Sequence, residues 1–403
     1  MQPISPVNLA SPHFKADPHP FYARLRAEAP VYRTVLPDKQ VAWLITRYDD
    51  VVAVLRDERF AKDRLNATPP GQRAKGPWAP GFIKPLLRNM LDLDAPDHTR
   101  LRALVHKGFT PRLIEQLRER VQTLADELLT AAQRKGSLEL MADYALPLPL
   151  TIIAEMLGVP MRDRQKFTRW TKQVVSVSSA ADGIKVIPAL WAFIRYLRRL
   201  IKLRRVEPRD DLVSALIQAK EAGDALSEDE LLAMIFLLLT AGHETTVNLI
   251  GSGTLALLQH PDQLERLRQD PALIKPAIEE LLRFTSPVEL ATERYAREEI
   301  TLRGTTIPHG ALVHVVLGSA NRDERQFVAP DTLDLARDPN RHLAFGQGEH
   351  YCLGAPLARL EGQIAIATLL RRMPELHLVQ RPEALHWRRG LVLRGLEQLP
   401  LAG

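Results

Sequence analysis

The 403-residue sequence contains long segments that predict helices and short segments that predict strands. Residues 188–206 carry apolar side chains at helical spacing, and residues 231–260 begin with an almost uniformly apolar run behind a helix-capping pattern. Two short segments, residues 31–46 and 300–305, have the pattern of β-hairpins. Hydrophobic residues make up 45% of the chain and charged residues 25%. This balance is typical of a soluble globular protein with a sizeable core.

The chain has a formal net charge of +6 and a single cysteine, so no intramolecular disulfide can form. The first 21 residues lack the basic and apolar regions of a signal peptide, and we expect no membrane anchor. Both features favour a cytoplasmic protein. The basic residues form no aromatic-rich module, so nucleic acid is not an expected partner, and an acidic protein fits the charge better.

The first predicted element is a hairpin in which Val31–Leu36 and Val41–Thr46 are joined across residues 37–39. Residues 64–88 are rich in proline and glycine and show little periodicity, which predicts a long loop. Long loops in compact domains are often functional. A merely solvated connection is the alternative.

His98 and Arg102 are four residues apart in a predicted helix. They would share one helical face and could bind an anion together. A generic surface helix has the same pattern, so the pair by itself does not define a site.

Residues 188–206 predict an amphipathic helix, preceded by a loop over residues 176–186. Such a basic helix can lie on a membrane or meet an acidic surface. A solvated face is the more common case and the one we favour. The basic residues of the outer face are Arg195, Arg198, Arg199, Lys202 and Arg205.

Residues 231–260 predict a long helix that starts with a capping box at Ser227 and Glu230. At about 1.5 Å per residue it would extend about 45 Å. Its apolar run is too short for a membrane span, so we expect a central buried helix. Gly242, Glu244 and Thr245 are costly inside such a helix. Either a function offsets this cost, or a threonine hydroxyl bonds back to the preceding turn and bends the helix.

Cys352 lies in a glycine-rich stretch, Phe345 to Gly354, directly before a helix that Pro356 would start. A lone cysteine is usually a small buried hydrophobic residue. A helix N-terminus, however, favours the thiolate. One cysteine cannot build a tetrahedral zinc or iron–sulfur site, which leaves a nucleophile or a single axial ligand. The apolar positions that would form the buried face of the helix are Leu357, Leu360, Ile364 and Ala367.

The run Phe345-x-x-Gly348-x-x-x-Cys352-x-Gly354 resembles the haem-binding loop of the cytochrome P450 family, in which this cysteine is the proximal ligand of haem iron. Ala241-Gly242-x-Glu244-Thr245 resembles the family's oxygen-activating segment, where the small pair lets the helix approach the haem and the acid and alcohol relay protons. The resemblance implies one domain over residues 1–403, mainly α with small β-sheets, with haem b between the long helix and the cysteine loop.

Glu280 and Arg283 resemble the family's Glu-x-x-Arg pair, a buried structural clamp behind the haem loop. By spacing alone they would be an ordinary surface pair. We expect His342 to complete the network. By the same resemblance Asn321-Arg322-Asp323 is a structural element.

The resemblance also assigns residues around the haem. Phe345 would pack near the sulfur, and the propionates would be held by His98, Arg102, Arg294 and His350. The distal pocket would be lined by Val288, Leu290 and Ala291, for which packed core positions are the alternative, together with the 64–90 loop and the 170–195 region.

The implied reaction inserts one atom of O2 into an apolar small molecule, such as a terpenoid, steroid, fatty acid or polyketide, by hydroxylation or epoxidation. Electrons would come from a ferredoxin or flavodoxin with its reductase, docking near Arg100, Arg102 and Lys107. Two alternatives remain open here: a peroxide-driven peroxygenase, whose members typically lack the acid and alcohol of residues 244 and 245, and a non-catalytic haem-binding scaffold.

Overall fold

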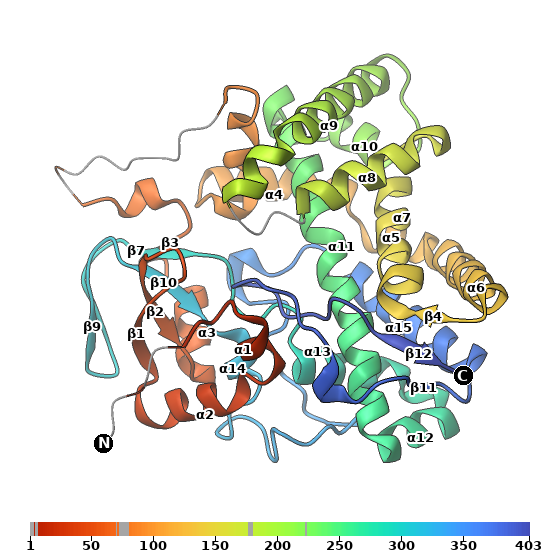
Figure 1. The fold of residues 1–403 in the computed structure, drawn as a ribbon. Helices are drawn as coiled ribbons and strands as arrows, with labels where there is room; N and C mark the ends of the chain where they lie inside the picture. Colours follow the sequence, from red (N-terminus) through yellow and green to blue (C-terminus); the bar gives the residue numbers. More distant parts are fainter. Residues whose placement is uncertain (1–3, 5–6, 70, 72–79, 176–179, 222–223) are drawn as a thin grey trace. The chain divides into compact units, whose positions relative to one another are not determined.

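The computed structural model describes the chain except residues 1–3, 5–6, 70, 72–79, 176–179 and 222–223 (Figure 1). The described residues are mostly helical, with small sheets of two to five strands, which confirms the predicted fold class. They form two compact units. The first consists of residues 1–74, 124–145 and 245–403, and the second of residues 75–123 and 146–244.

The largest sheet of the first unit has the strand order β1-β2-β10-β7-β3. β1 and β2 are antiparallel, with Val31 opposite Ile45 and a turn in which Lys39 has a φ of 69°, so the N-terminal hairpin is confirmed. A second hairpin, β8–β9, turns through Arg303 and Gly304, as predicted. The strands of this unit are β1 (Val31–Val35), β2 (Val41–Ile45), β3 (Phe60–Ala61), β4 (Leu138–Glu139), β7 (Arg294–Ala296), β8 (Ile300–Leu302), β9 (Thr305–Ile307), β10 (Leu312–Val315), β11 (His377–Leu378) and β12 (Pro400–Ala402).

Helices α13 and α15 pack against each other and share a core with the last turns of α11. Gly362 of α15 allows the close approach, because a Cβ there would lie 2.9 Å from Leu249 of α11. The helices within the first unit are α1 (Pro12–Ala16), α2 (His19–Glu28), α3 (Tyr48–Arg56), α12 (Pro261–Gln269), α13 (Ile274–Thr285), α14 (Leu317–Ala320) and α15 (Ala355–Arg372).

α15 begins directly behind the cysteine loop, with Pro356 in its first turn, as the sequence predicts. Leu357, Leu360 and Ile364 are buried, but Ala367 is exposed. At 3.6 residues per turn, position 367 has rotated to the edge of the face that these residues define, and Thr368 takes the buried place instead.

α11 (Glu228–Gln259) contributes residues to both units. The predicted capping box is present: the Glu230 amide donates to Ser227 Oγ at 3.3 Å, and the Ser227 amide donates to Glu230 Oε2 at 2.8 Å. By length and composition alone α11 could cross a membrane, but core helices of soluble proteins pass the same test.

The described part of the second unit is helical apart from the short strands β5 (Lys220–Glu221) and β6 (Asp224–Ala225). The loop predicted over residues 176–186 is wrong from Ala180 on, because α9 begins there and continues through Pro188. A proline is expected to start a helix, but inside one it removes a single backbone donor, and the alanines before it favour the helix. The helices are α4 (Asp97–Gly108), α5 (Pro111–Gln116), α6 (Arg118–Lys135, which continues into the first unit), α7 (Pro147–Met156), α8 (Arg164–Val175), α9 (Ala180–Val206) and α10 (Leu212–Gln218).

Short one-turn helices occupy several connections. Within the long loop predicted over residues 64–88, the described parts include two such turns, η1 and η2. Residues 72–79 of this loop lie outside the described residues. The one-turn helices are η1 (Arg64–Ala67), η2 (Lys84–Leu87), η3 (Met90–Asp92), η4 (Met141–Ala145), η5 (Met161–Asp163), η6 (Pro271–Leu273), η7 (Gly348–His350) and η8 (Pro382–Ala384).

Candidate haem-thiolate site

The cysteine loop is closed by its own backbone. The Cys352 amide donates to the Phe345 carbonyl at 3.0 Å, so the two ends of the loop are bonded to each other. Gly346 and Gly348 have φ values of 68° and 78°, which favour glycine. A Cβ at Gly348 would also lie 2.8 Å from the Leu55 carbonyl oxygen. Gly348 therefore lets the loop pack closely against α3, whereas Gly346 serves only the turn of the loop.

Cys352 is exposed and precedes α15 by three residues. The nearby helix N-terminus favours the ionised sulfur. A Cβ placed on Gly354 would lie 3.9 Å from the sulfur, so the loop backbone passes close to it without covering it. With one cysteine in the whole sequence, the donor set fits a single axial ligand of a haem and not a multi-cysteine metal site.

The acid and alcohol predicted on the long helix are consecutive residues of α11. Glu244 and Thr245 are half-buried, whereas Ala241 and Gly242 are exposed. A back-bonded threonine does occur in this helix, at Thr240, whose hydroxyl donates to the Phe236 carbonyl at 2.9 Å. The back-bonding that was the structural alternative for Thr245 is therefore seen at Thr240. The proton-relay roles of Glu244 and Thr245 stay predictions.

Sequence reasoning missed a third polar group, Glu361 of α15. It is 1% exposed, and neither carboxylate oxygen has a hydrogen-bond partner of good geometry among the described residues. Burial raises the pKa of Glu361 to about 8, against the opposing effect of the Thr246 hydroxyl. The side chain is therefore a neutral acid at pH 7, next to the residue that follows Thr245. No spacing rule marks it, because its position in α15 is compatible with an ordinary surface glutamate.

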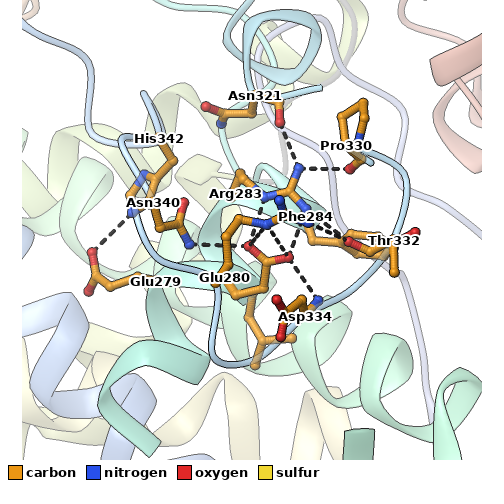
Figure 2. A network of polar contacts seen from close by, with 12 residues as sticks. Glu279, Glu280, Arg283, Phe284, Asn321, Pro330, Thr332, Asp334, Asn340 and His342 are labelled. Atoms are coloured by element: carbon orange, nitrogen blue, oxygen red, sulfur yellow. Dashed lines mark hydrogen bonds and ion pairs between the residues drawn. The ribbon is translucent and has the colours of Figure 1, made fainter. Parts of the chain in front are cut away.

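Glu280 and Arg283 form a buried ion pair with two hydrogen bonds of 2.7 Å, and both side chains are fully buried (Figure 2). Arg283 also donates to the carbonyls of Asn321 at 2.9 Å, Pro330 at 2.8 Å and Thr332 at 3.2 Å. The pair thus ties α13 to the segment that leads into the cysteine loop.

His342 takes a different place from the one expected. The Glu280 carboxylate also accepts hydrogen bonds from the Asp334 amide at 3.0 Å, from Arg337 at 3.2 Å and from the Asn340 side chain at 3.1 Å. His342 Nε2 lies 3.0 Å from Glu279, one residue earlier (Figure 2). Consecutive helix residues point about 100° apart, so two neighbouring glutamates serve two separate networks.

The four predicted propionate contacts are divided between the units. In the first unit, Arg294 lies in β7 and is 3% exposed, and His350 lies in the cysteine loop with its Nε2 3.4 Å from Glu349. In the second unit, His98 is 2% exposed and Arg102 is half-buried, both on α4. Arginine and histidine side chains of this kind can donate hydrogen bonds to an anionic group.

The predicted substrate positions differ in burial. Leu290 is fully buried in a core cluster with Tyr22 and Leu44, while Val288 and Ala291 are half-buried. The segment is extended and bridges to Val316 and Leu393. Only Val288 and Ala291 therefore keep side-chain surface that a ligand could contact without displacing core residues.

The structure is a mainly helical chain with small sheets that presents one exposed cysteine just ahead of a helix. The family model "Cytochrome P450" matches residues 4–397. The chain therefore belongs to the cytochrome P450 family, as its motifs indicated.

Individual relatives cover nearly the whole chain. "Polyketide biosynthesis cytochrome P450 PksS" of Bacillus subtilis (strain 168) is 45% identical over 392 residues, 96% of each protein. "Cytochrome P450 monooxygenase PikC" of Streptomyces venezuelae is 46% identical over 402 residues, 99% of this chain and 94% of that protein. The solved structure of the Bacillus subtilis PksS protein matches with a TM-score of 0.91 at 44% identity, covering 98% of this chain and 99% of that one.

Membership of this family establishes the cofactor and the reaction class. The chain is a haem b-dependent monooxygenase, an oxidoreductase that hydroxylates or epoxidises small organic molecules.

Proposed function

We propose that residues 1–403 form one cytoplasmic monooxygenase domain that oxidises an apolar polyketide. The observation that supports the chemistry is the exposed Cys352 thiol in a loop fixed by its own backbone. The substrate class is supported by the PksS relative, whose name places it in polyketide biosynthesis. Haem b, when bound, supplies the iron chemistry that activates O2.

In this proposal Cys352 would hold the haem iron through its sulfur. The N-terminus of α15, three residues farther along the chain, favours the thiolate form of a cysteine, and thiolate ligation is the form that would favour O–O cleavage once haem is bound. Phe345 contributes through the hydrogen bond from the Cys352 amide to its carbonyl. His98, Arg102, Arg294 and His350 hold the propionates, and Ala241 is the small residue that lets α11 approach the ring.

Glu244 and Thr245 move the protons that oxygen cleavage consumes. Both are half-buried and consecutive on α11, so they can exchange protons with water. Glu361 supports this assignment, since it holds a proton at neutral pH beside Thr246.

Val288 and Ala291 contact the substrate, and Leu290 supports their segment from the core. A small molecule that packs on aliphatic side chains is itself expected to be largely apolar.

Electrons are delivered by a ferredoxin or flavodoxin with its reductase. Of the expected docking residues, Arg100 is paired with Glu230, Arg102 is half-buried and Lys107 is exposed on α4. Lys107 is thus the most accessible charge for an acidic partner, and its effect should appear in the association rate and its salt dependence.

The ligand assignment is tested by spectroscopy of the reduced, carbon monoxide-bound holoprotein. The wild type is expected to show the red-shifted Soret band of thiolate ligation, and Cys352→Ala is expected to lose it. A normal spectrum in Cys352→Ala would contradict the assignment. Spectral titration with a macrolactone, against a steroid and a fatty acid, then tests the substrate class.

The proton relay is tested with Thr245→Ala. Reductant consumption is expected to continue while product per electron falls and hydrogen peroxide rises, because the alcohol no longer directs protons. Thr240→Ala is the matched control on the same helix. Among the described residues, the Thr240 hydroxyl donates only to the Phe236 and Leu237 carbonyls of the preceding turn. Undiminished product per electron in Thr245→Ala would remove the residue from the mechanism.

A further inference from the structure

One arginine contacts both ends of the cysteine loop. Arg359 lies on α15, and its guanidinium carbon is 4.5 Å from the centroid of the Phe345 ring. Its Nη1 donates to the Tyr351 hydroxyl at 3.2 Å. Phe345 starts the loop and Tyr351 directly precedes Cys352, and their rings are 6.3 Å apart. The guanidinium thus contacts the first residue of the loop and the residue before the cysteine.

Glu279 holds this arginine in place. Arg359 Nε and Nη2 donate to the two carboxylate oxygens of Glu279 at 2.7 and 2.8 Å, a bidentate arrangement with fixed geometry. His342 bonds the same carboxylate at 3.0 Å, and its ring lies 6.0 Å from that of Phe345. Phe345 is therefore surrounded by a network that starts at α13.

Both charges persist at physiological pH. Burial opposes ionisation of Glu279, but hydrogen bonds from His342 and Arg359, together with the arginine's charge, lower its pKa to about 2. The side chains of Arg359 and Glu279 are 30% and 28% exposed. A pair this accessible adds little to stability, about 1 kcal/mol or less. The adjacent Glu280–Arg283 pair already anchors α13, so stability alone does not account for a second arginine placed on Phe345.

We propose that Arg359, oriented by Glu279, is a positioning residue that holds Phe345 and Tyr351 and whose charge tunes the Cys352 thiolate and the reduction potential of the haem. The inference rests on the proposed role of Cys352 as axial ligand. A positive charge near the sulfur stabilises the state that carries one more electron, and a negative charge does the opposite. The two charges of the pair therefore act on the potential with opposite signs.

The test is a dithionite titration of holoprotein, which adds one electron to the ferric haem. Arg359→Met is expected to shift the reduction potential to more negative values, and Glu279→Gln to more positive values. The double variant should fall between the two. Arg372→Met is the matched control: it lies on the same helix, is 28% exposed and is paired with Asp126 at 3.0 Å, but it is thirteen residues farther from the loop. It should leave the potential unchanged.

Arg359→Lys separates charge from geometry. It keeps the charge but lacks the planar fork that bonds Glu279 and stacks on Phe345. Its potential should stay near the wild type, while the red-shifted carbon monoxide band should decay faster on storage. This variant also covers the case in which Arg359→Met does not retain haem.

Shifts of the same sign in Arg359→Met and Glu279→Gln, or shifts no larger than in Arg372→Met, would overturn the proposal. Failure of the underlying assignment looks different, because the wild type would then lack the red-shifted band altogether.

Discussion

Two fully buried glutamates on neighbouring helices show how partners decide the role of a carboxyl group. Glu280 on α13 accepts hydrogen bonds from Arg283, Arg337, Asn340 and the Asp334 amide. Glu361 on α15 has none of good geometry among the described residues. The first is part of an ion pair, and the second holds a proton, with a pKa raised to about 8.

Burial alone does not define the charge state of a carboxyl group. Desolvation acts against the charge of both groups, and hydrogen bonds to the ionised form decide the outcome. A satisfied buried ion pair fixes structure, whereas an unsatisfied buried acid is available for proton transfer.

The largest effect is expected at Arg283. Arg283→Met leaves the Glu280 charge buried without its main partner and the carbonyls of Asn321 and Pro330 without their donor. The free energy of unfolding of the holoprotein, measured with denaturant, should fall by about 3–5 kcal/mol. Arg283→Lys should recover only part of it, since an ammonium cannot reproduce the planar fork. A loss below about 1 kcal/mol would mean that the pair is not a clamp.

Glu361→Gln should remove a pH dependence of stability. In the wild type the pKa is about 8 in the folded state and 4.5 in the unfolded state, so the folded state binds the extra proton between these values. The contribution of Glu361 to the free energy of unfolding should therefore be largest below about pH 4.5. It should fall as the pH rises toward 8, by up to about 1.4 kcal/mol per pH unit.

Glutamine carries no such proton, so the variant should lose this slope and be more stable than the wild type at pH 8. The measurement is denaturant unfolding of holoprotein from pH 5 to pH 9. Glu383→Gln, at an exposed position of η8, is the control and should keep the wild-type slope. Parallel profiles for Glu361→Gln and wild type would show that Glu361 is ionised when folded.

The smallest effect is expected at an exposed pair. Arg24 and Glu28 are four residues apart on α2, at 3.1 Å, with side chains 38% and 33% exposed. Glu28→Gln should change the free energy of unfolding by about 0.5 kcal/mol or less, and the change should vanish in 1 M salt. A larger, salt-insensitive change would show that the Arg24–Glu28 pair stabilises the fold as a buried ion pair does, and not as an exposed one.

Much of the site could be predicted because its signals are local. The glycine pattern before Cys352, the capping box at Ser227 and the turn at Gly304 each depend on a few consecutive residues, and the structure contains all three elements. Two expectations failed. α9 continues through Pro188 instead of starting there, and Thr368 takes the buried place expected for Ala367, because at 3.6 residues per turn position 367 lies at the edge of the face.

The sequence by itself determined the family, the helix that follows the loop, and the pairing of Glu280 with Arg283. Each of these depends on motif spacing or helical periodicity among residues that are close together in the chain. Only the tertiary structure decided that Glu361 is a buried neutral acid, that His342 bonds Glu279, and that Arg359 stacks on Phe345. Desolvation and hydrogen-bond geometry depend on residues far apart in the chain, and no spacing rule records them.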